Sequence, residues 1–338
     1  MIAMKKQEYY NAVKRFAEVR IAVVGDVMLD VYLWGTVNRI SPEAPVPVVN
    51  VTKKSFCLGG AANVMRNIAT CGGKVYAFGA IGEDEAGNEL LTELSKFGIN
   101  SDGIVRSPRR RTTEKCRVIA GAQQLLRTDF EDALPLEEQL REKMVAEIEK
   151  LIERSAVDVI IFDDYAKGVL SAWMLERIIA VAAEKNVITI LDPKPKAGGV
   201  TPVKGLTLLK PNRGEAFALS QVHDEGVVSD PAADAALNSA AGRISEIWDP
   251  EFLLISLASQ GMALYRRGEL QQIIPTTARE VFDVSGAGDT VAAVCAMAMA
   301  SGCEAVDAAA IANYAAGVVV GKIGTAPIYA EELLSVLN

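Results

Sequence analysis

Short apolar runs alternate along the chain with longer segments in which apolar residues recur every three or four positions. Runs such as Arg20–Gly25, Val157–Phe162 and Phe252–Ser256 have the length and composition of strands that are buried on both faces. The segments between such runs, for example 171–185, have the periodicity of amphipathic helices. Regular alternation of this kind predicts an α/β fold in which helices cover both faces of a mostly parallel sheet.

The remaining elements follow from the same pattern. Further strands are predicted at residues 74–79, 187–191 and 206–210, with a short one around Ile104. Further helices are predicted at residues 1–18, 83–97, 135–154 and 214–220.

Two segments depart from this alternation. Residues 32–57 contain three prolines among alternating valines, which exclude a helix or a central strand and favour an exposed or edge strand. Residues 112–129 alternate in polarity around a turn at Gly121, which is typical of a hairpin. We expect the two segments to form a small β-sheet lid over the main sheet, made of about residues 32–57 and 108–130.

A buried helix with an unusual entrance lies near the C-terminus. Residues 291–300 have almost no polar side chain, and Gly286, Ala287 and Gly288 precede them at a helix start, where unpaired N–H groups attract anions. The same N-terminus favours the ionised form of Asp289 in the first turn. A carboxylate beside an anion site is suited to deprotonating a hydroxyl that attacks a phosphoryl group. The alternative is an aspartate that only stabilises its own helix.

Polar motifs follow four of the predicted strands, at residues 163–168, 192–194, 210–215 and Ser256. Each one alone is explained by the start of a capped helix. Because the carboxyl ends of parallel strands meet at one edge of a sheet, four such motifs together indicate a binding site.

A glycine-rich segment, Leu58-Gly-Gly-Ala-Ala-Asn-Val64, is predicted to open a helix that runs to about Ala69. Its small residues allow a ligand to approach the backbone, and the Asn63 amide offers a donor and an acceptor to a sugar hydroxyl. Close packing of the helix on a strand explains the glycines equally well. Asp26 and Asp30, after the first strand, are either ligand contacts or solvated loop residues.

A basic cluster lies between residues 106 and 117 of an otherwise acidic chain. Its members are Arg106, Arg109, Arg110, Arg111, Lys115 and Arg117. Such a cluster is suited to capturing a phosphorylated substrate, and a solvated loop is the alternative for the consecutive arginines.

Composition excludes several classes of protein. A net charge of −8 over 338 residues argues against nucleic-acid binding. Five scattered cysteines indicate reduced thiols in a cytoplasmic protein. Neither a signal peptide nor an apolar run long enough to span a membrane is present. The single histidine, His223, excludes multi-histidine metal sites and serine-hydrolase triads.

The order of these motifs resembles the ribokinase-type (PfkB) sugar kinases over about residues 20–325. The segment Asp283-Val-Ser-Gly-Ala-Gly-Asp-Thr290 carries most of the resemblance, together with the Gly-Gly-Ala-Ala-Asn segment and Asn212-x-x-Glu215. The resemblance implies a three-layer α/β/α ribokinase-like domain covering residues 1–338, with the lid inserted into it.

Four further segments resemble one subfamily, the kinases of D-glycero-β-D-manno-heptose 7-phosphate. They are residues 25–30, 39–48, 164–168 and 318–325. This resemblance implies ATP-dependent phosphorylation of the anomeric hydroxyl to the 1,7-bisphosphate, on the route to ADP-heptose and lipopolysaccharide. A kinase of another sugar or sugar phosphate, such as ribose or a fructose phosphate, remains an alternative. A catalytically silent sugar-phosphate sensor is another.

The resemblance also assigns roles to residues. Asp289 matches the catalytic base, with the anion hole at Gly286, Ala287 and Gly288. The matches for sugar binding are Asp30, Gly59, Gly60, Asn63 and Asp164. The matches for ATP binding are Lys194, Asn212, Glu215, Ser256, Gly261 and Asn313. Glu215 matches a magnesium-positioning residue acting through water, and Asp283 and Ser285 match ligands of a monovalent cation such as K⁺. Charge and placement alone suggest Lys115, Arg117 and Lys167 as holders of the substrate phosphate.

The chain also departs from the pattern of its family. The segment Ser256-Leu-Ala-Ser-Gln-Gly261 lacks an acidic residue that many relatives have before this glycine. Many relatives in the subfamily carry a second, nucleotidyltransferase domain with a His-x-Gly-His element, which a chain with one histidine does not contain. We therefore expect a kinase-only form. Exposed valines on the lid edge predict a homodimer formed through the lid.

Overall fold

A computed structural model describes residues 2–121, 123–195, 199, 201–278, 280–322 and 324–337. Its main sheet has nine strands in the order β13-β12-β11-β10-β9-β8-β1-β4-β5. Their bounds are β1 Arg20–Gly25, β4 Lys74–Gly82, β5 Asn100–Ser107, β8 Val159–Asp163, β9 Ile188–Asp192, β10 Leu208–Leu209, β11 Phe252–Ser256, β12 Met262–Arg266 and β13 Glu269–Ile274.

The strands from β5 to β11 are parallel to their neighbours, which confirms the predicted mostly parallel sheet. Only β12 and β13, at the far edge, run antiparallel. Strand β5 is longer than the short strand expected around Ile104, and β10 has only two residues. The parallel register pairs Asp163 with Asp192, and a bridge joins Asn212 to Ser256. The four predicted polar motifs therefore meet at one edge of the sheet.

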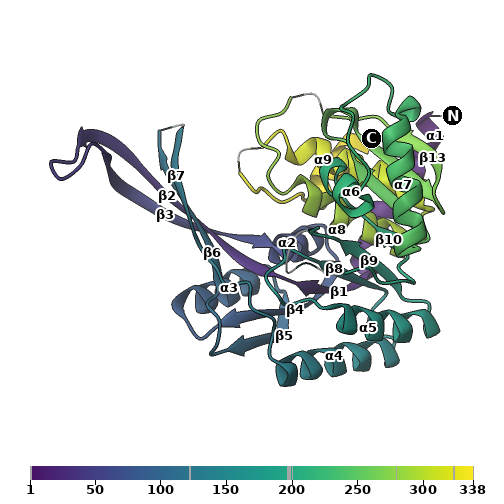
Figure 1. Cartoon of the computed structure of the whole chain (residues 1–338), viewed down its shortest axis with the longest axis horizontal. Helices are drawn as coiled ribbons and strands as arrows, with labels where there is room; N and C mark the ends of the chain where they lie inside the picture. Colours follow the sequence, from purple (N-terminus) through teal and green to yellow (C-terminus); the bar gives the residue numbers. More distant parts are fainter. Residues whose placement is uncertain are drawn as a thin grey trace.

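Helices cover both faces of this sheet (Figure 1). They are α1 Ile2–Lys14, α2 Ala61–Thr70, α3 Glu85–Lys96, α4 Glu138–Glu153, α5 Ala172–Glu184, α6 Arg213–Ser220, α7 Ala235–Trp248, α8 Ala287–Ala300, α9 Ala305–Val319 and α10 Ala330–Leu337. Alternate residues of β1 enter two separate cores, Val23 on the side of α2, α8 and α9 and Val24 on the side of α4, α5 and α7. Burial on both faces explains why the strand sequences are almost wholly apolar.

The predicted buried helix is α8, which packs between α2 and α9. Its residues 289–298 are all buried, including the polar Asp289 and Thr290. Gly302, with φ of 85°, follows its last turn in the left-handed conformation that ends many helices. Of the described helices, none is both long enough and apolar enough to cross a membrane.

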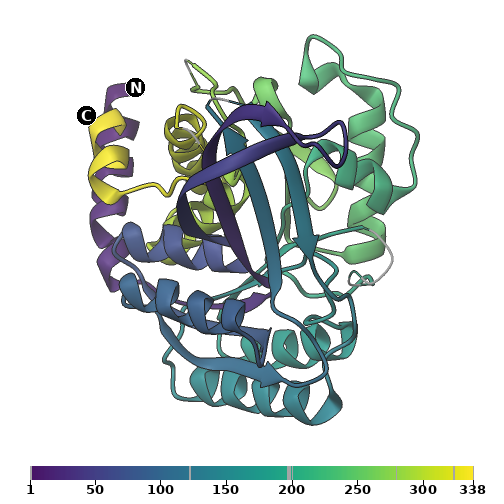
Figure 2. The same ribbon diagram turned by 90° about the vertical axis from the view of Figure 1, so that its left-hand side faces the viewer.

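A second, four-stranded sheet has the order β3-β2-β6-β7. Its strands are β2 Val27–Ile40, β3 Pro47–Gly60, β6 Thr113–Ala120 and β7 Gln123–Phe130. The outer half of the β2–β3 hairpin projects beyond the rest of the molecule (Figure 1) and points toward the viewer in Figure 2. The prolines lie in its turn and at the start of β3, which is an edge strand. These strands come from the segments for which we predicted a lid; Ala122, within them, lies outside the described residues.

Two local predictions were wrong in detail. Gly59 and Gly60 are the last residues of strand β3, because Gly59 pairs with Met28 and Gly60 with Val27 across the sheet, although Gly60 is also the N-cap of helix α2. Helix α2 begins only at Ala61. Asp30 lies inside strand β2 and not in a loop after β1.

Candidate active site

Asp289 lies at the centre of a buried polar group at the start of α8. Its side chain accepts two hydrogen bonds, one from Asn63 Nδ2 to Oδ2 at 2.7 Å and one from the Tyr165 hydroxyl to Oδ1 at 2.9 Å. Burial raises the pKa of Asp289, although these two donors and the nearby Lys210 ammonium act in the opposite direction. A helix N-terminus alone predicts a lowered pKa for Asp289, so this prediction was wrong in direction. A raised pKa makes the carboxylate a stronger base.

The backbone conformation at the start of α8 requires glycine at position 286. Gly286 has φ of 80°, and a Cβ atom there would lie 2.7 Å from Asn63 Nδ2. The first-turn N–H groups of a helix have no acceptor within the helix, so those of Gly288 and Asp289 are available to a ligand. A Cβ atom on Gly288 would lie 3.7 Å from Lys210 Nζ, which places a buried ammonium beside this entrance. A helix start and a lysine together are suited to an anion.

Three groups near Asp289 open the predicted strand-end motifs, but the sequence assigned them no individual role. Asp163 ends β8, Asp192 ends β9, and Lys210 follows β10. Lys210 Nζ lies 2.8 Å from Asp192 Oδ2, and burial raises the pKa of Asp192 to about 6. Burial and the charges of Asp289 and Asp192 raise the pKa of Asp163, whose buried Oδ2 has no hydrogen-bond partner among the described residues. Their position at strand ends was the available signal.

The proposed sugar-binding residues converge beside Asp289. Asp30 forms a buried ion pair with Arg117, with 2.7 Å between Oδ1 and Nη1. A Cβ atom on Gly59 would lie 2.8 Å from Asp30 Oδ2, so glycine leaves room for this carboxylate. Lys115 Nζ lies 5.9 Å from the centre of the Tyr165 ring. Two cationic side chains of β6 therefore approach the group around Asp289 from the four-stranded sheet.

Both ends of the Asn63 amide have partners in the structure. Its Nδ2 donates to Asp289, and its Oδ1 accepts from Arg66 Nη2 at 2.6 Å. Arg66 also donates to the carbonyl of Thr325 and is only 4% exposed. This buried arginine fixes which end of the amide faces Asp289. A weak signal for this role was present in the sequence, because Arg66 is the one charged residue of helix α2.

The segment after β8 holds two further predicted residues. Asp164 Oδ1 accepts the N–H of Ala166 at 2.7 Å, and Lys167 Nζ lies 2.5 Å from Glu131 Oε1. Asp26 accepts N–H groups of this segment and does not lie in a solvated loop. The sequence did not assign it this structural role.

The predicted nucleotide residues form a second group along the sheet edge. Asn212 caps α6, and the Glu215 side chain accepts the Asn212 N–H in return at 3.0 Å. The other oxygen of Glu215 lies 2.7 Å from Lys194 Nζ. Ser256 lies beside Asn212 in the sheet. The structure thus brings together Lys194, Asn212, Glu215 and Ser256.

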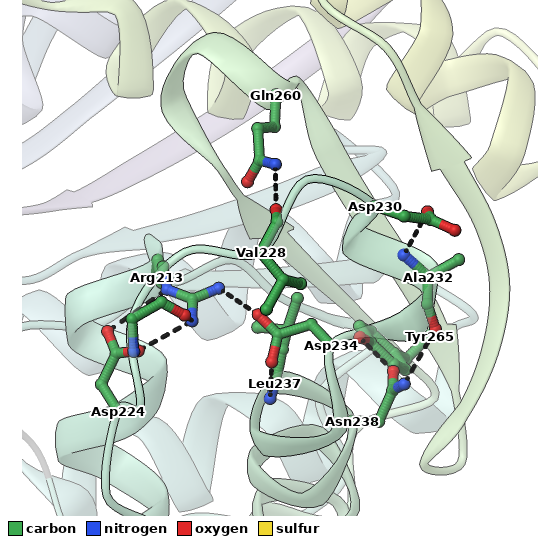
Figure 3. A network of polar contacts seen from close by, with 11 residues as sticks. Arg213, Asp224, Val228, Asp230, Ala232, Asp234, Leu237, Asn238, Gln260 and Tyr265 are labelled. Carbon is green, nitrogen blue, oxygen red and sulfur yellow. Dashed lines mark hydrogen bonds and ion pairs between the residues drawn. The ribbon is translucent and has the colours of Figure 1, made fainter.

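Arg213, which the sequence reasoning missed, secures the element between Asn212 and Glu215. Its guanidinium pairs with Asp224 and Asp234, both at 2.7 Å, and also donates to the Gly226 carbonyl (Figure 3). Asp234 in turn caps α7. The loop that follows α6 is thereby held against α7, and His223 is an exposed residue of this loop.

Two other predicted nucleotide residues meet a different segment. Asn313 Nδ2 donates to the Pro275 carbonyl at 2.7 Å. Gly261, with φ of 91°, leaves no room for a Cβ atom, which would lie 2.0 Å from the Ile274 carbonyl oxygen. Both residues therefore border residues 274–276.

The predicted cation ligands lie in the loop before α8. Asp283 accepts the N–H of Ser285 at 2.9 Å and that of Gly324 at 3.1 Å. Burial acts against ionisation, but these hydrogen bonds and Arg117 lower the pKa of Asp283. The Ser285 residue is exposed. Ile323, in the motif that follows α9, lies outside the described residues.

The basic cluster divides into two parts. Lys115 and Arg117 approach the site from β6, as described above. Arg106 and Arg111 instead bind Asn88 and Asp132, at 2.7 and 3.2 Å. Arg110 donates to the Lys167 carbonyl at 2.5 Å. Only part of the cluster therefore lies where it can contact a substrate.

The sequence pattern of pfkB family carbohydrate kinases matches residues 19–331. The chain belongs to this family. Its members include curated relatives that match nearly the whole chain. Bifunctional protein HldE of Geobacter metallireducens is 40% identical over 331 residues, covering 98% of this chain and 65% of that protein. Bifunctional protein HldE of a Caulobacter species is 42% identical over 326 residues, covering 96% of this chain and 64% of that protein. The chain thus spans just under two thirds of their length.

Solved structures confirm the ribokinase-like fold. Phosphofructokinase-2 from Escherichia coli in complex with potassium superposes with a TM-score of 0.72 at 18% identity, covering 94% of this chain and 98% of that one. Arabidopsis thaliana ribokinase complexed with ribose and ATP gives a TM-score of 0.67 at 20% identity, covering 95% and 99%. The chain is therefore a carbohydrate kinase by family and a ribokinase-like protein by fold.

Proposed function

We propose that this pfkB family protein transfers the γ-phosphoryl group of ATP to the anomeric hydroxyl of D-glycero-β-D-manno-heptose 7-phosphate, giving the 1,7-bisphosphate. Family membership supports a kinase that uses ATP. The four segments at 25–30, 39–48, 164–168 and 318–325 support the heptose subfamily. The observation that carries the chemistry is the buried, twice hydrogen-bonded Asp289 beside the anion-binding start of α8.

Asp289 is the proposed base. As the sugar hydroxyl attacks the phosphoryl group in line, the hydroxyl proton passes to a free lone pair of the Asp289 carboxylate. The N–H groups at Gly286, Ala287 and Gly288 are the proposed anion hole, which offsets the charge that develops on the oxygens of the transferred group. The Ala287 N–H donates to the Val284 carbonyl at 3.2 Å in the structure, so a phosphoryl oxygen would have to replace this contact. Lys210, buried beside Gly288, adds a positive charge at the same place.

The residues present fit a magnesium–nucleotide complex. Mg²⁺ bound with a nucleotide is held mostly by phosphates, waters and one or two carboxylates, and the Glu215 carboxylate lies among the predicted nucleotide residues. Glu215 is the proposed protein group, acting through water, with Lys194, Asn212 and Ser256 beside it. Asn313 and Gly261 are proposed nucleotide contacts. When bound, Mg²⁺ neutralises charge on the phosphates.

The substrate phosphate is proposed to lie against Lys115, Arg117 and Lys167. Arg117 and Lys167 already pair with Asp30 and Glu131, so a phosphate would join or replace these carboxylates. Asp30, Gly59, Gly60, Asn63 and Asp164 are the proposed sugar contacts. The four-stranded sheet is proposed to act as the lid that excludes water from them.

A cation site and a dimer interface complete the proposal. Asp283, held by two backbone N–H groups, and Ser285 are proposed to bind a monovalent cation such as K⁺, which would stabilise the loop before α8. The exposed edge of β3 is proposed to pair with a second copy, giving a homodimer through the lid.

The test is release of ADP with Mg-ATP and each of heptose 7-phosphate, fructose 6-phosphate, fructose 1-phosphate, ribose and adenosine. The proposal predicts a strong preference, in kcat/KM, for heptose 7-phosphate. Preference for another compound would contradict the proposed substrate but not the proposed kinase chemistry. Nucleotide binding without turnover of any compound would contradict both and favour the sensor.

A further inference from the structure

Tyr165 contacts Asp289 but has no part in the function proposed above. Its hydroxyl donates to Asp289 Oδ1 at 2.9 Å, while Asn63 donates to Oδ2 at 2.7 Å. The two donors approach different oxygens and come from different elements, the segment after β8 and helix α2. Together they determine how the carboxylate plane is turned.

The backbone around Tyr165 is fixed by a buried carboxylate. Asp26, 2% exposed, accepts the N–H groups of Tyr165 at 2.9 Å, Lys167 at 3.0 Å and Val169 at 3.2 Å. Ala166 has φ of 56°, so the chain turns sharply between Tyr165 and Lys167. The backbone from which the phenol projects is therefore held in place, and the hydrogen bond to Asp289 sets the direction of the phenol itself.

We infer that Tyr165 is a positioning residue, which holds the Asp289 carboxylate so that a free lone pair points at the acceptor hydroxyl. A carboxylate has about four acceptor sites, and the two donors leave room for a substrate hydroxyl on either oxygen. The inference rests on the proposed function, because it takes Asp289 as the base. Loss of the Tyr165 hydroxyl should turn the Asp289 carboxylate away from the acceptor hydroxyl and leave the nucleotide site unchanged.

Several charged groups face Asp289, and each affects its ionisation. Asp30 on β2 and Asp163 at the end of β8 disfavour the carboxylate, whereas Lys210 after β10 favours it. Donation from Tyr165 also favours the carboxylate and so lowers the pKa of Asp289. Burial keeps the phenol itself protonated by raising its own pKa well above the usual value. Removing the phenol hydroxyl should therefore make Asp289 easier to protonate.

The test is Tyr165→Phe in the full chain, compared with wild type across pH with saturating Mg-ATP. A hydrogen bond to a charged group corresponds to roughly a tenfold effect or more. We expect kcat to fall about tenfold, KM for ATP to stay unchanged, and the acid limb of the kcat profile to move up by about one pH unit. The acid limb reflects the titration of Asp289 together with its neighbour Asp163. The comparison therefore uses the shift of the limb between the two proteins and not the pH at which the limb lies.

Tyr265→Phe is the matched control. Tyr265 is buried and donates to Asn238 Oδ1 at 2.8 Å, away from Asp289 (Figure 3). The Tyr265→Phe substitution should lower the melting temperature without moving the acid limb of the kcat profile. A Tyr165→Phe enzyme that melts like wild type but keeps both its kcat and its acid limb would overturn the inference. So would a lower kcat with an unmoved limb. If wild type prefers a different sugar in the panel above, the proposed substrate fails, and the same comparison on that sugar still tests Tyr165.

Discussion

The polar group around Asp289 and the outer half of the β2–β3 hairpin use their residues in opposite ways. In the polar group, Asp289, Asn63 and Arg66 are each less than 10% exposed, and each is held by at least one neighbour from another part of the chain. On the hairpin, Ile40 and Val46 are 62% and 51% exposed. The side chains around Asp289 are held by protein contacts without a ligand. The hairpin instead exposes apolar side chains that the proposed second copy would cover.

Mutations in these two regions should therefore have different effects on function. A change near Asp289 leaves a buried polar group without its partner, which costs far more than the loss of a contact at the surface. A change at the exposed hairpin should leave the fold intact and affect only what the hairpin binds. The predictions below test this contrast.

Asp289→Asn should have the largest effect. A positioned base contributes about 10²–10⁴-fold to the rate, so kcat should fall by about that factor. Nucleotide binding should persist, because Lys194, Asn212 and Glu215 form a separate group. Steady-state kinetics and ATP titration by calorimetry would measure the two effects. Turnover equal to wild type would exclude Asp289 as the base.

Arg117→Met should raise KM for the sugar phosphate by roughly 10–100-fold, since hydrogen bonds to charged groups contribute about 1.5–3 kcal/mol. The change also leaves Asp30, buried in strand β2, without its cation. Arg111→Met is the control, because Arg111 pairs with Asp132 at the surface, away from Asp289. Equal effects of the two substitutions on KM would contradict a specific role for Arg117.

Activity should decline in acid because the base must be ionised. Burial raises the pKa of Asp289, and its active form is present above that pKa and lost as pH falls through it. Once below this pKa, kcat should fall about tenfold per pH unit. A pH profile of kcat for the wild-type protein would show the limb. A flat profile across the acid range would argue that the rate-limiting step does not use this carboxylate.

Val51→Lys should have the smallest effect on the molecule itself. Val51 is 45% exposed on the edge strand β3, so the free energy of unfolding should change by no more than about 0.5 kcal/mol. Light scattering should nevertheless show a shift from dimer to monomer. Leu126→Lys is the control, since Leu126 is 55% exposed on β7, at the opposite edge of the same sheet. A wild-type protein that is monomeric at micromolar concentration would remove the dimer proposal.

Periodicity and strand-end motifs predicted most of the fold, because burial on two faces leaves a strong apolar pattern in β1, β8 and β11. Helix α8 was predicted for the same reason. The boundary near Gly59 was missed because pairing with Met28 on β2, a long-range contact, decides where β3 ends. Strands β12 and β13 were not predicted, and they pair antiparallel at the edge of the sheet, outside the strand–helix alternation on which the prediction relied.

The site was predicted less completely than the fold. Asp289 stood out because an acidic residue at a helix start next to glycines has a local signature. Tyr165, Arg66 and Lys210 did not, because each acts through a partner that is distant in the sequence. The pKa of Asp289 was predicted in the wrong direction for a related reason. The helix N-terminus is visible in the sequence, whereas the burial that outweighs it is not.

The most direct test of the central claim is to identify the product. The protein would be incubated with Mg-ATP and heptose 7-phosphate, and the product examined by ³¹P NMR with coupling to the sugar protons. We expect a new phosphate ester signal coupled to the anomeric proton, while the 7-phosphate signal persists. A phosphate ester at any other carbon, or no new ester while nucleotide still binds, would contradict it.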